Sequence, residues 1–157
     1  HHGKGALPLF EDGGVSARLI LGTAYGEAAP ATMFSDTFYL DVTLAPGARF
    51  PLPDDHEDRG IYVTEGAIRV AGQRFEAGRM MVFRPGDRIT VEAGERGARI
   101  MALGGATLNG PRHIWWNFVA SSRERIEHAK EEWRAAHWGQ GLFDLPATDH
   151  DEFIPLP

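Results

Sequence analysis

Residues 111–127 read Pro-Arg-His-Ile-Trp-Trp-Asn-Phe-Val-Ala-Ser-Ser-Arg-Glu-Arg-Ile-Glu. An apolar, aromatic run from His113 to Val119 stops at two serines, and a charged segment with helical spacing follows. Ser121 and Glu124 match a capping box, in which two side chains bond the free amides of a helix's first turn. The two adjacent tryptophans would face opposite sides of a strand, so both sides need cover. The stretch predicts a last strand wedged between a β-core and its own C-terminal helix.

Upstream of this stretch the sequence has the pattern of many short strands. In residues 38–44 the apolar side chains alternate with polar ones, which predicts an inward row of Phe38, Leu40, Val42 and Leu44. Glycine-bearing turns then separate strands expected at 61–64, 67–70, 73–75, 79–84, 88–92 and 98–103. Short strands at this spacing indicate a β-sandwich or barrel. We therefore predict an all-β fold with one C-terminal helix from about Ser122 to Trp138, ended by Gly139.

The expected organisation follows the chain in four parts. Residues 1–14, rich in glycine, are expected to be a linker or N-terminal arm, and residues 15–119 a β-barrel. Residues 120–139 are expected to hold the C-terminal helix. Residues 140–157 combine prolines with apolar side chains, which predicts an extended tail held against the domain. The opening His1-His2 is either a purification-tag remnant or native sequence in the loop of a longer chain.

Composition restricts the classes of function. The 157 residues carry a net charge of −6 and no cysteine. Without cysteine there is neither a disulfide nor a thiolate metal site, which favours a reducing, cytoplasmic location. No apolar run approaches the ~20 residues of a membrane span. The basic residues are spread out, which disfavours direct binding to nucleic acid.

One region resembles a metal-binding motif. Residues 54–58 read Asp-Asp-His-Glu-Asp, residues 61–66 read Ile-Tyr-Val-Thr-Glu-Gly, and Pro85-Gly86 follows. This layout resembles the two motifs of the cupin superfamily, a double-stranded β-helix or jelly-roll barrel. In cupins, histidines and a glutamate from neighbouring strands converge on one metal ion.

The cupin ligands themselves are missing from this sequence. Counted back from Tyr62, the glutamate position falls on Asp58 and the two histidine positions fall on Asp54 and Leu52. The second motif supplies no histidine, so we expect no metal. Asp54, His56 and Asp58 are either a remodelled cation site or, as we favour, a solvated acidic loop with a surface histidine. The other histidines, His113, His128, His137 and His150, are expected to be structural or merely exposed.

Two further groups are candidates for a pocket or an interface. If Asp58 faces inward, Tyr62 lies on the same face of the strand. The two side chains would then supply polar contacts inside an apolar pocket. An aromatic group could line a pocket or interface, although a helix–sheet seam is the more usual role of such residues. The group comprises Trp115, Trp116, Asn117, Phe118 and Trp133.

The block Trp-Trp-Asn-Phe-Val-Ala-Ser-Ser at 115–122, with Phe-Tyr-Leu-Asp-Val at 38–42 and the ending at 151–157, resembles the C-terminal half of pirins. Pirins are two-cupin proteins in which the N-terminal cupin binds iron through three histidines and a glutamate. The resemblance implies a metal-free C-terminal cupin, cut from a longer chain, with a structural role beside an iron-bearing partner half. That half of the same protein, another protein, or a second copy is the expected partner.

The resemblance also implies two alternatives. Some family members are similar to quercetin 2,3-dioxygenases, so the intact protein could be an oxygenase to which this half contributes. A cupin of this kind could instead bind a small ligand, with Tyr62 as the polar contact. No catalytic or cofactor-binding residue is assigned within this chain, and iron is expected only in the other half.

Overall fold

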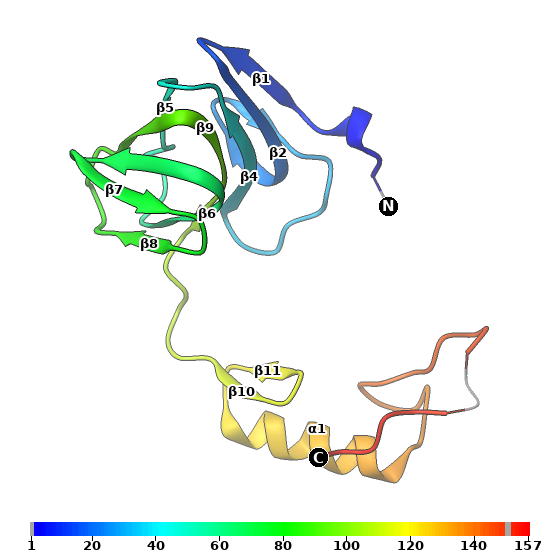
Figure 1. The fold of residues 1–157 in the computed structure, drawn as a ribbon. Coiled ribbons are helices and arrows are strands. Elements are labelled where there is room, and N and C mark those ends of the chain that lie inside the picture. The colour runs from blue at the N-terminus through cyan, green and yellow to red at the C-terminus, as the bar shows by residue number, and fades with distance from the viewer. Residues whose placement is uncertain (1, 150–151) are drawn as a thin grey trace. The chain divides into compact units, whose positions relative to one another are not determined.

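The computed structural model describes residues 2–149 and 152–157, so His150 lies outside the described residues. The chain divides after Thr107 into two compact units, and each is described by itself. The first unit contains a sheet, and the second contains a hairpin and a helix (Figure 1). In the described part of the chain, no helix has both the length and the apolar composition needed to cross a membrane.

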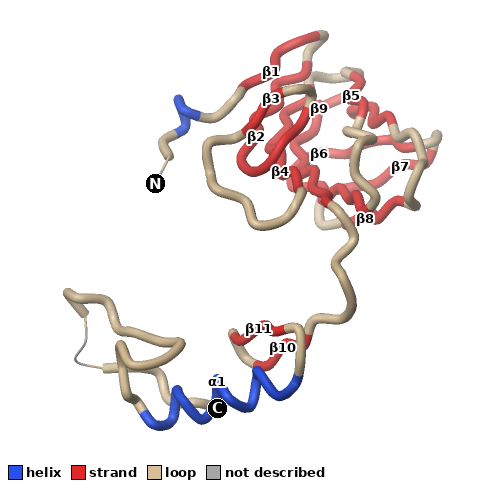
Figure 2. The backbone as a smooth tube through the Cα atoms, turned by 180° about the vertical axis from the view of Figure 1, so that it is seen from behind, coloured by secondary structure: helices blue, strands red, loops and turns tan. Residues whose placement is uncertain are grey.

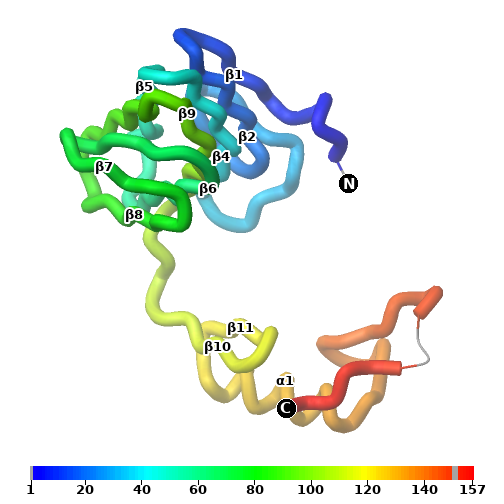
Figure 3. Tube along the Cα trace, in the orientation of Figure 1, coloured from blue at the N-terminus to red at the C-terminus, as the bar shows by residue number. Residues whose placement is uncertain are grey.

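The first unit is a nine-stranded antiparallel sheet that curls on itself (Figure 3). Its strands pair in the order β1-β2-β4-β9-β6-β7, while β3, β5 and β8 pair with β2, β9 and β6. A short 3-10 helix, Lys4–Ala6, precedes it. The strands are β1 Leu9–Asp12, β2 Val15–Ala24, β3 Glu27–Ala28, β4 Thr37–Leu44, β5 Arg49–Pro51, β6 Asp58–Val70, β7 Gln73–Glu76, β8 Met80–Phe83 and β9 Thr90–Gly105. The predicted all-β jelly roll with one C-terminal helix is confirmed.

The sheet curls because its two longest strands bend together. β6 and β9 pair almost throughout, with register shifts between Val63 and Glu65 and between Gly66 and Ile68. Gly66 has a φ of +72°, and a Cβ there would lie 2.3 Å from the carbonyl oxygen of Gly97. Only glycine tolerates both the backbone conformation and the close approach. The glycine sites that were expected to separate strands 61–64 and 67–70, and strands 88–92 and 98–103, are therefore bends within continuous strands.

The inside of the curled sheet is a packed apolar core. The predicted inward row of β4 is confirmed, since Phe38, Leu40, Val42 and Leu44 are all at most 2% exposed. Neighbouring strands add the fully buried side chains Leu19, Ile61, Val63, Ile68, Val91 and Ile100. Burying each of these side chains contributes about 1.5–3 kcal/mol, so this core is a major source of the free energy that holds the curled sheet together.

The N-terminal residues are more ordered than a linker. Residues 9–12, within the expected arm, form β1, which pairs with β2 from Leu9↔Arg18 to Asp12↔Val15. Gly13 and Gly14 both have positive φ and form the turn between the two strands. The predicted Gly13-Gly14 turn is therefore a hairpin loop that adds an edge strand to the sheet.

The second unit does not contain the expected last strand of the β-core. Instead, β10 His113–Trp115 and β11 Phe118–Ala120 pair with each other, and α1 Arg123–Ala135 follows directly (Figure 2). Trp116 sits in the turn with a φ of +51°, so the two tryptophans do not face opposite sides of one strand. Residues 108–119 therefore group with the helix rather than with the sheet, because their pairing partners lie inside the second unit.

The helix begins and ends slightly inside its predicted bounds. Ser122, rather than Ser121, is the N-cap, and its side chain accepts a hydrogen bond from the amide of Arg125 at 3.4 Å. At the other end, Ala136 takes the left-handed conformation that was expected of Gly139. Each cap satisfies backbone groups that the helix leaves free.

Candidate functional site

The three candidate ligands of the acidic segment that resembles a cupin motif do not come together in the described residues. Asp54 and Asp58 are exposed, whereas His56 is 5% exposed, so the three side chains do not share one side. Asp58 accepts a hydrogen bond from Thr107, and Asp54 lies 3.8 Å from Arg88. Nowhere in the described residues do three histidine, aspartate or glutamate side chains gather closely enough to hold a metal ion. The remodelled cation site is not formed.

His56 is not the surface histidine of a solvated loop. Its Nε2 lies 3.2 Å from Oδ1 of Asp36, and its ring packs 5.0 Å from the ring of Phe38. Its Nδ1 is buried and has no partner among the described residues. The imidazole therefore anchors the loop before β6 to the start of β4, and we assign it a structural role.

The charged group inside the sheet is Arg59, which sequence reasoning missed. Its side chain is 2% exposed and lies on the inward side of β6, in alternation with Ile61 and Val63. The guanidinium donates to the backbone carbonyls of Pro53, Arg84 and Asp87, at 3.2, 3.4 and 2.6 Å, and its Nε has no partner in the described part of the chain. A permanent positive charge next to the motif's glutamate position opposes a metal cation there.

Tyr62 lies on the outside of the sheet, which corrects the expected inward pocket. It is 41% exposed, and it does share a side with Asp58, but that side faces outward. Its register partners are Met80 on β8 and Met101 on β9. Tyr62 therefore belongs to a surface rather than to a cavity.

The surface around Tyr62 is unusually apolar for the outside of a sheet. Met80 is 49% and Val82 is 77% exposed, although an antiparallel sheet normally presents polar side chains to water. Across β9 and β4, the next outward positions are Leu103 and its register partner Tyr39. We call this surface the outer apolar face; it consists of Tyr39, Tyr62, Met80, Val82, Met101 and Leu103.

An ion pair borders the outer apolar face. Arg99 donates two hydrogen bonds to the carboxylate of Asp41, at 2.9 and 2.7 Å, and lies 3.7 Å from Glu65. The hydrogen bond from Arg99 lowers the pKa of Asp41 below its usual value. Charged groups at the edge of an apolar surface are the usual arrangement of a protein interface.

The aromatic group of the second unit is a helix–hairpin seam. Phe118 is 8% exposed and packs with Ile126 and Ala129 of the helix. Trp115 and Trp116 lie 6.0 and 5.5 Å from the ring of Phe118. Trp116 also contacts Trp133, while Asn117 is exposed in the turn. These aromatic side chains therefore form a seam between the helix and a two-stranded hairpin, not between the helix and the β-core as predicted, and Asn117 is not part of it.

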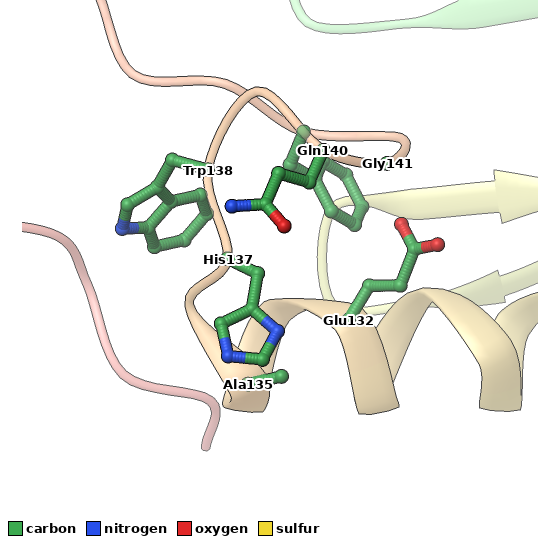
Figure 4. Close-up of a pocket in the computed structure, with 7 residues that line it drawn as sticks. Glu132, Ala135, His137, Trp138, Gln140 and Gly141 are labelled. Atoms are coloured by element: carbon green, nitrogen blue, oxygen red, sulfur yellow. The ribbon is translucent and has the colours of Figure 1, made fainter.

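A small pocket lies just beyond the seam, at the end of α1. It has a volume of about 180 Å³, and Figure 4 shows Glu132, His137 and Gln140 around it, with Trp138 at its side. Glu132 accepts a hydrogen bond from the amide of Leu142 at 2.7 Å. A Cβ on Gly141 would lie 2.6 Å from the same carboxylate. Trp133 was a candidate from the sequence, but this pocket was not predicted. Its only trace in the sequence is the pair of glycines Gly139 and Gly141.

Known protein families show which family the chain belongs to. The family model of the pirin C-terminal cupin domain matches residues 39–139. The chain belongs to this pirin family. A pirin-like protein of Caulobacter vibrioides is 43% identical over 157 residues, which are 100% of this chain and 52% of that protein. A Pseudomonas aeruginosa protein named "Putative quercetin 2,3-dioxygenase" is 30% identical and covers 96% of this chain and 48% of its own length.

A solved structure has a similar fold. The crystal structure described as quercetin 2,3-dioxygenase from Acinetobacter baumannii superposes with a TM-score of 0.76 and 23% identity, over 86% of this chain and 48% of that one. At this identity the likeness shows the fold. This pirin domain spans about half the length of the curated relatives it matches.

Proposed function

We propose that this pirin domain is a metal-free cupin that acts as a structural and interface module beside an iron-bearing cupin. Its partner is the N-terminal cupin half of a two-cupin pirin; a second copy of this chain or another protein is the alternative partner. In this proposal the domain itself binds no cofactor, works in the cytoplasm, and contacts neither nucleic acid nor membrane.

The observation that carries the proposal is the buried guanidinium of Arg59. A cupin metal needs imidazole and carboxylate donors that converge on one point, but here one inward position at that level of the sheet holds a cation bound to three carbonyls. The residues present therefore do not fit a metal ion. In this proposal the domain keeps the cupin fold but not the reactive metal centre of a cupin.

The outer apolar face supports the interface role. Met80, Val82 and Tyr62 expose apolar surface next to one another on strands β6 and β8. A contiguous patch bordered by charged residues is typical of a docking surface. The curated relatives are about twice as long as this chain, which leaves room in them for a second domain of similar size.

The test of the metal claim is elemental analysis of purified chain after loading with Fe(II) and removal of unbound metal. We expect far less than one iron per chain, and no oxygen consumption with quercetin. Stoichiometric iron that is lost in Asp54→Asn, with the fold retained by circular dichroism, would overturn the metal-free assignment. Asp144→Asn, which changes an exposed carboxylate in the second unit, is the matched control.

The test of the interface claim is binding of this chain to the separately produced N-terminal half of the Caulobacter relative. We expect Val82→Ser and Met80→Ser to weaken binding, because each removes exposed apolar surface from the outer apolar face. Leu142→Ser, which removes an apolar side chain that is 57% exposed in the second unit, is the control. Equal binding by all variants would contradict this docking surface.

The second candidate is a contribution to a quercetin 2,3-dioxygenase-like reaction of a longer protein, favoured by the name of the Pseudomonas relative. Oxygen consumption that requires the partner half would support this role. Oxygen consumption by this chain alone, lost in His56→Ala but not in Asp144→Asn, would assign the activity to this half. A third candidate, small-ligand binding, would use the Figure 4 pocket rather than Tyr62. A melting shift with flavonols that Glu132→Gln abolishes would support it.

A further inference from the structure

A basic hollow lies on the first unit, and one of its residues, Arg88, follows the Pro85-Gly86 turn of the cupin-like motif. It has a volume of about 340 Å³ and lies where β5, the β6–β7 turn and the start of β9 meet. Arginines from three separate segments line it, namely Arg49 on β5, Arg69 on β6 and Arg88 in the loop before β9. None of these arginines belongs to residues 54–58 or 61–66 or to the outer apolar face.

The positive charges of the hollow are poorly compensated. Glu92 is the register partner of both Arg49 and Arg69, yet the nearest contact is 3.9 Å, between Arg69 Nη1 and Glu92 Oε1. Arg88 is 91% exposed and reaches only to 3.8 Å from Asp54. Three arginines face two carboxylates within 4 Å, Glu92 beside Arg69 and Asp54 beside Arg88, which leaves one excess positive charge in a chain of net charge −6.

The donors of these arginines are also free. A guanidinium carries five N–H donors in a planar fork that matches the oxygens of phosphate and carboxylate groups. In residues 2–149 and 152–157, no side-chain N–H of Arg49, Arg69 or Arg88 is recorded within hydrogen-bond distance of an acceptor. The hydroxyl of Thr90 adds a further donor at the wall of the hollow.

One wall of the hollow is apolar. Val70 and Ile89 are half-buried and pack against the main core, so each presents only part of its side chain to the hollow. An inorganic anion would leave this wall in water, whereas an organic group attached to the anion would cover it. The lining therefore combines an oxyanion-binding side with a hydrophobic side.

We propose that this hollow binds a small organic anion, with a phosphate or carboxylate head between Arg49, Arg69 and Arg88 and an apolar body against Val70 and Ile89. The anionic head would offset the excess positive charge at the lining. The site is independent of the proposed interface role, because it uses none of the residues of the outer apolar face. It gives the metal-free domain a ligand-binding function of its own.

The test is isothermal titration of the full chain with phenyl phosphate, benzoate and inorganic phosphate at matched ionic strength. We expect saturable binding of phenyl phosphate, tighter than that of inorganic phosphate because of the apolar wall. Tighter binding of benzoate than of phenyl phosphate would identify a carboxylate as the natural head group. Inorganic phosphate binding as tightly as phenyl phosphate, or no saturable binding by either organic anion, would overturn the proposal.

Substitutions locate the site. Arg49→Ala and Arg69→Ala should each weaken phenyl phosphate about tenfold, the usual effect of losing one charge-assisted contact. Arg79→Ala makes the same charge change at an exposed residue outside the hollow and should leave the affinity unchanged. The melting temperature of the ligand-free Arg49→Ala protein should not fall, because in the described chain no carboxylate lies within 4 Å of that guanidinium, although Glu92 is its register partner. Equal weakening in Arg79→Ala would show non-specific attraction and overturn the assignment.

Discussion

Arg59 donates a hydrogen bond from Nη2 to the backbone carbonyl of Asp87, with 2.6 Å between nitrogen and oxygen. Asp87 belongs to the turn at Pro85-Gly86, which is the second cupin-like motif. The contact therefore fastens this turn to the start of β6, the strand that carries residues 61–66 of the first motif. In the cupins that this sequence resembles, a metal ion joins the two motifs. In this domain a side chain does so.

We expect Arg59→Met to destabilise the domain by about 2–4 kcal/mol, because it fills most of the same volume but leaves the buried carbonyl of Pro53 and the part-buried carbonyl of Asp87 without this donor. Arg84→Ala is the control, since it removes an exposed side chain of the same turn and keeps the carbonyl that Arg59 contacts. Urea unfolding measures both. A loss in Arg59→Met no larger than in the control would show that Arg59 does not hold the turn.

Stability should fall in acid partly through Asp41. Its hydrogen bonds with Arg99 lower the pKa of the folded-state carboxyl, so the contribution of Asp41 is fully present above the unfolded-state pKa and is lost as pH falls through the lowered value. Asp41→Asn should therefore flatten the stability profile below about pH 4, which is close to the ordinary pKa of aspartate. Because Arg99 is exposed and Asp41 is only partly buried, the effect is small and should shrink in high salt. The measurement is urea unfolding between pH 2.5 and 6. The control is Asp12→Asn, because Asp12 has no arginine partner in the described chain. This variant should keep the full slope of unfolding free energy against pH.

Gly66→Ala should cost about 2–4 kcal/mol, because it adds a clash with the carbonyl of Gly97 to the strain of positive φ. Gly72→Ala separates the two effects. Gly72 has a φ of +80° but nothing within 4 Å of its would-be Cβ, so it should lose only about 1–2 kcal/mol. Thermal or urea unfolding of the two variants gives the comparison. Equal losses of unfolding free energy in Gly66→Ala and Gly72→Ala would mean that the clash with Gly97 adds nothing to the strain of positive φ.

The C-terminal tail is held to the helix by Trp133, whose Nε1 donates to the carbonyl of Ile154 at 2.8 Å. Trp133→Phe keeps a ring in the seam but removes this donor, and we expect a loss of about 1 kcal/mol. Limited proteolysis should then cut residues 152–157 faster. Trp115→Phe, which has no hydrogen bond to the tail, should leave that cutting rate unchanged; similar acceleration in both would point to general loosening of the seam.

Sequence reasoning succeeded where side-chain periodicity was decisive and failed where a single turn changed direction. The alternation of β4 gave the buried row from Phe38 to Leu44, because one face of that strand is covered and the other is not. The Trp115-Trp116 pair misled, since a positive φ at Trp116 reverses the chain into a hairpin. Side chains alternate along β6, so placing the inward position at Asp58 instead of Arg59 moved Tyr62 to the wrong face.

The basic hollow lay beyond sequence reasoning for a different reason. Arg49, Arg69 and Arg88 are spread over 40 positions of the chain and meet only through the pairing of β5, β6 and β9. The buried role of Arg59 is equally non-local, because its acceptors come from the loop before β6 and from a turn 25 or more residues later. A linear pattern carries no signal for such contacts.

β6 and β9 pair with each other on both sides of the bend at Gly66. The sheet is therefore continuous across the bend, and we expect its two sides to open together rather than separately. Hydrogen exchange should find the slowest amides of Ile61 and Ile68, one on each side of the bend, opening in the same rare event.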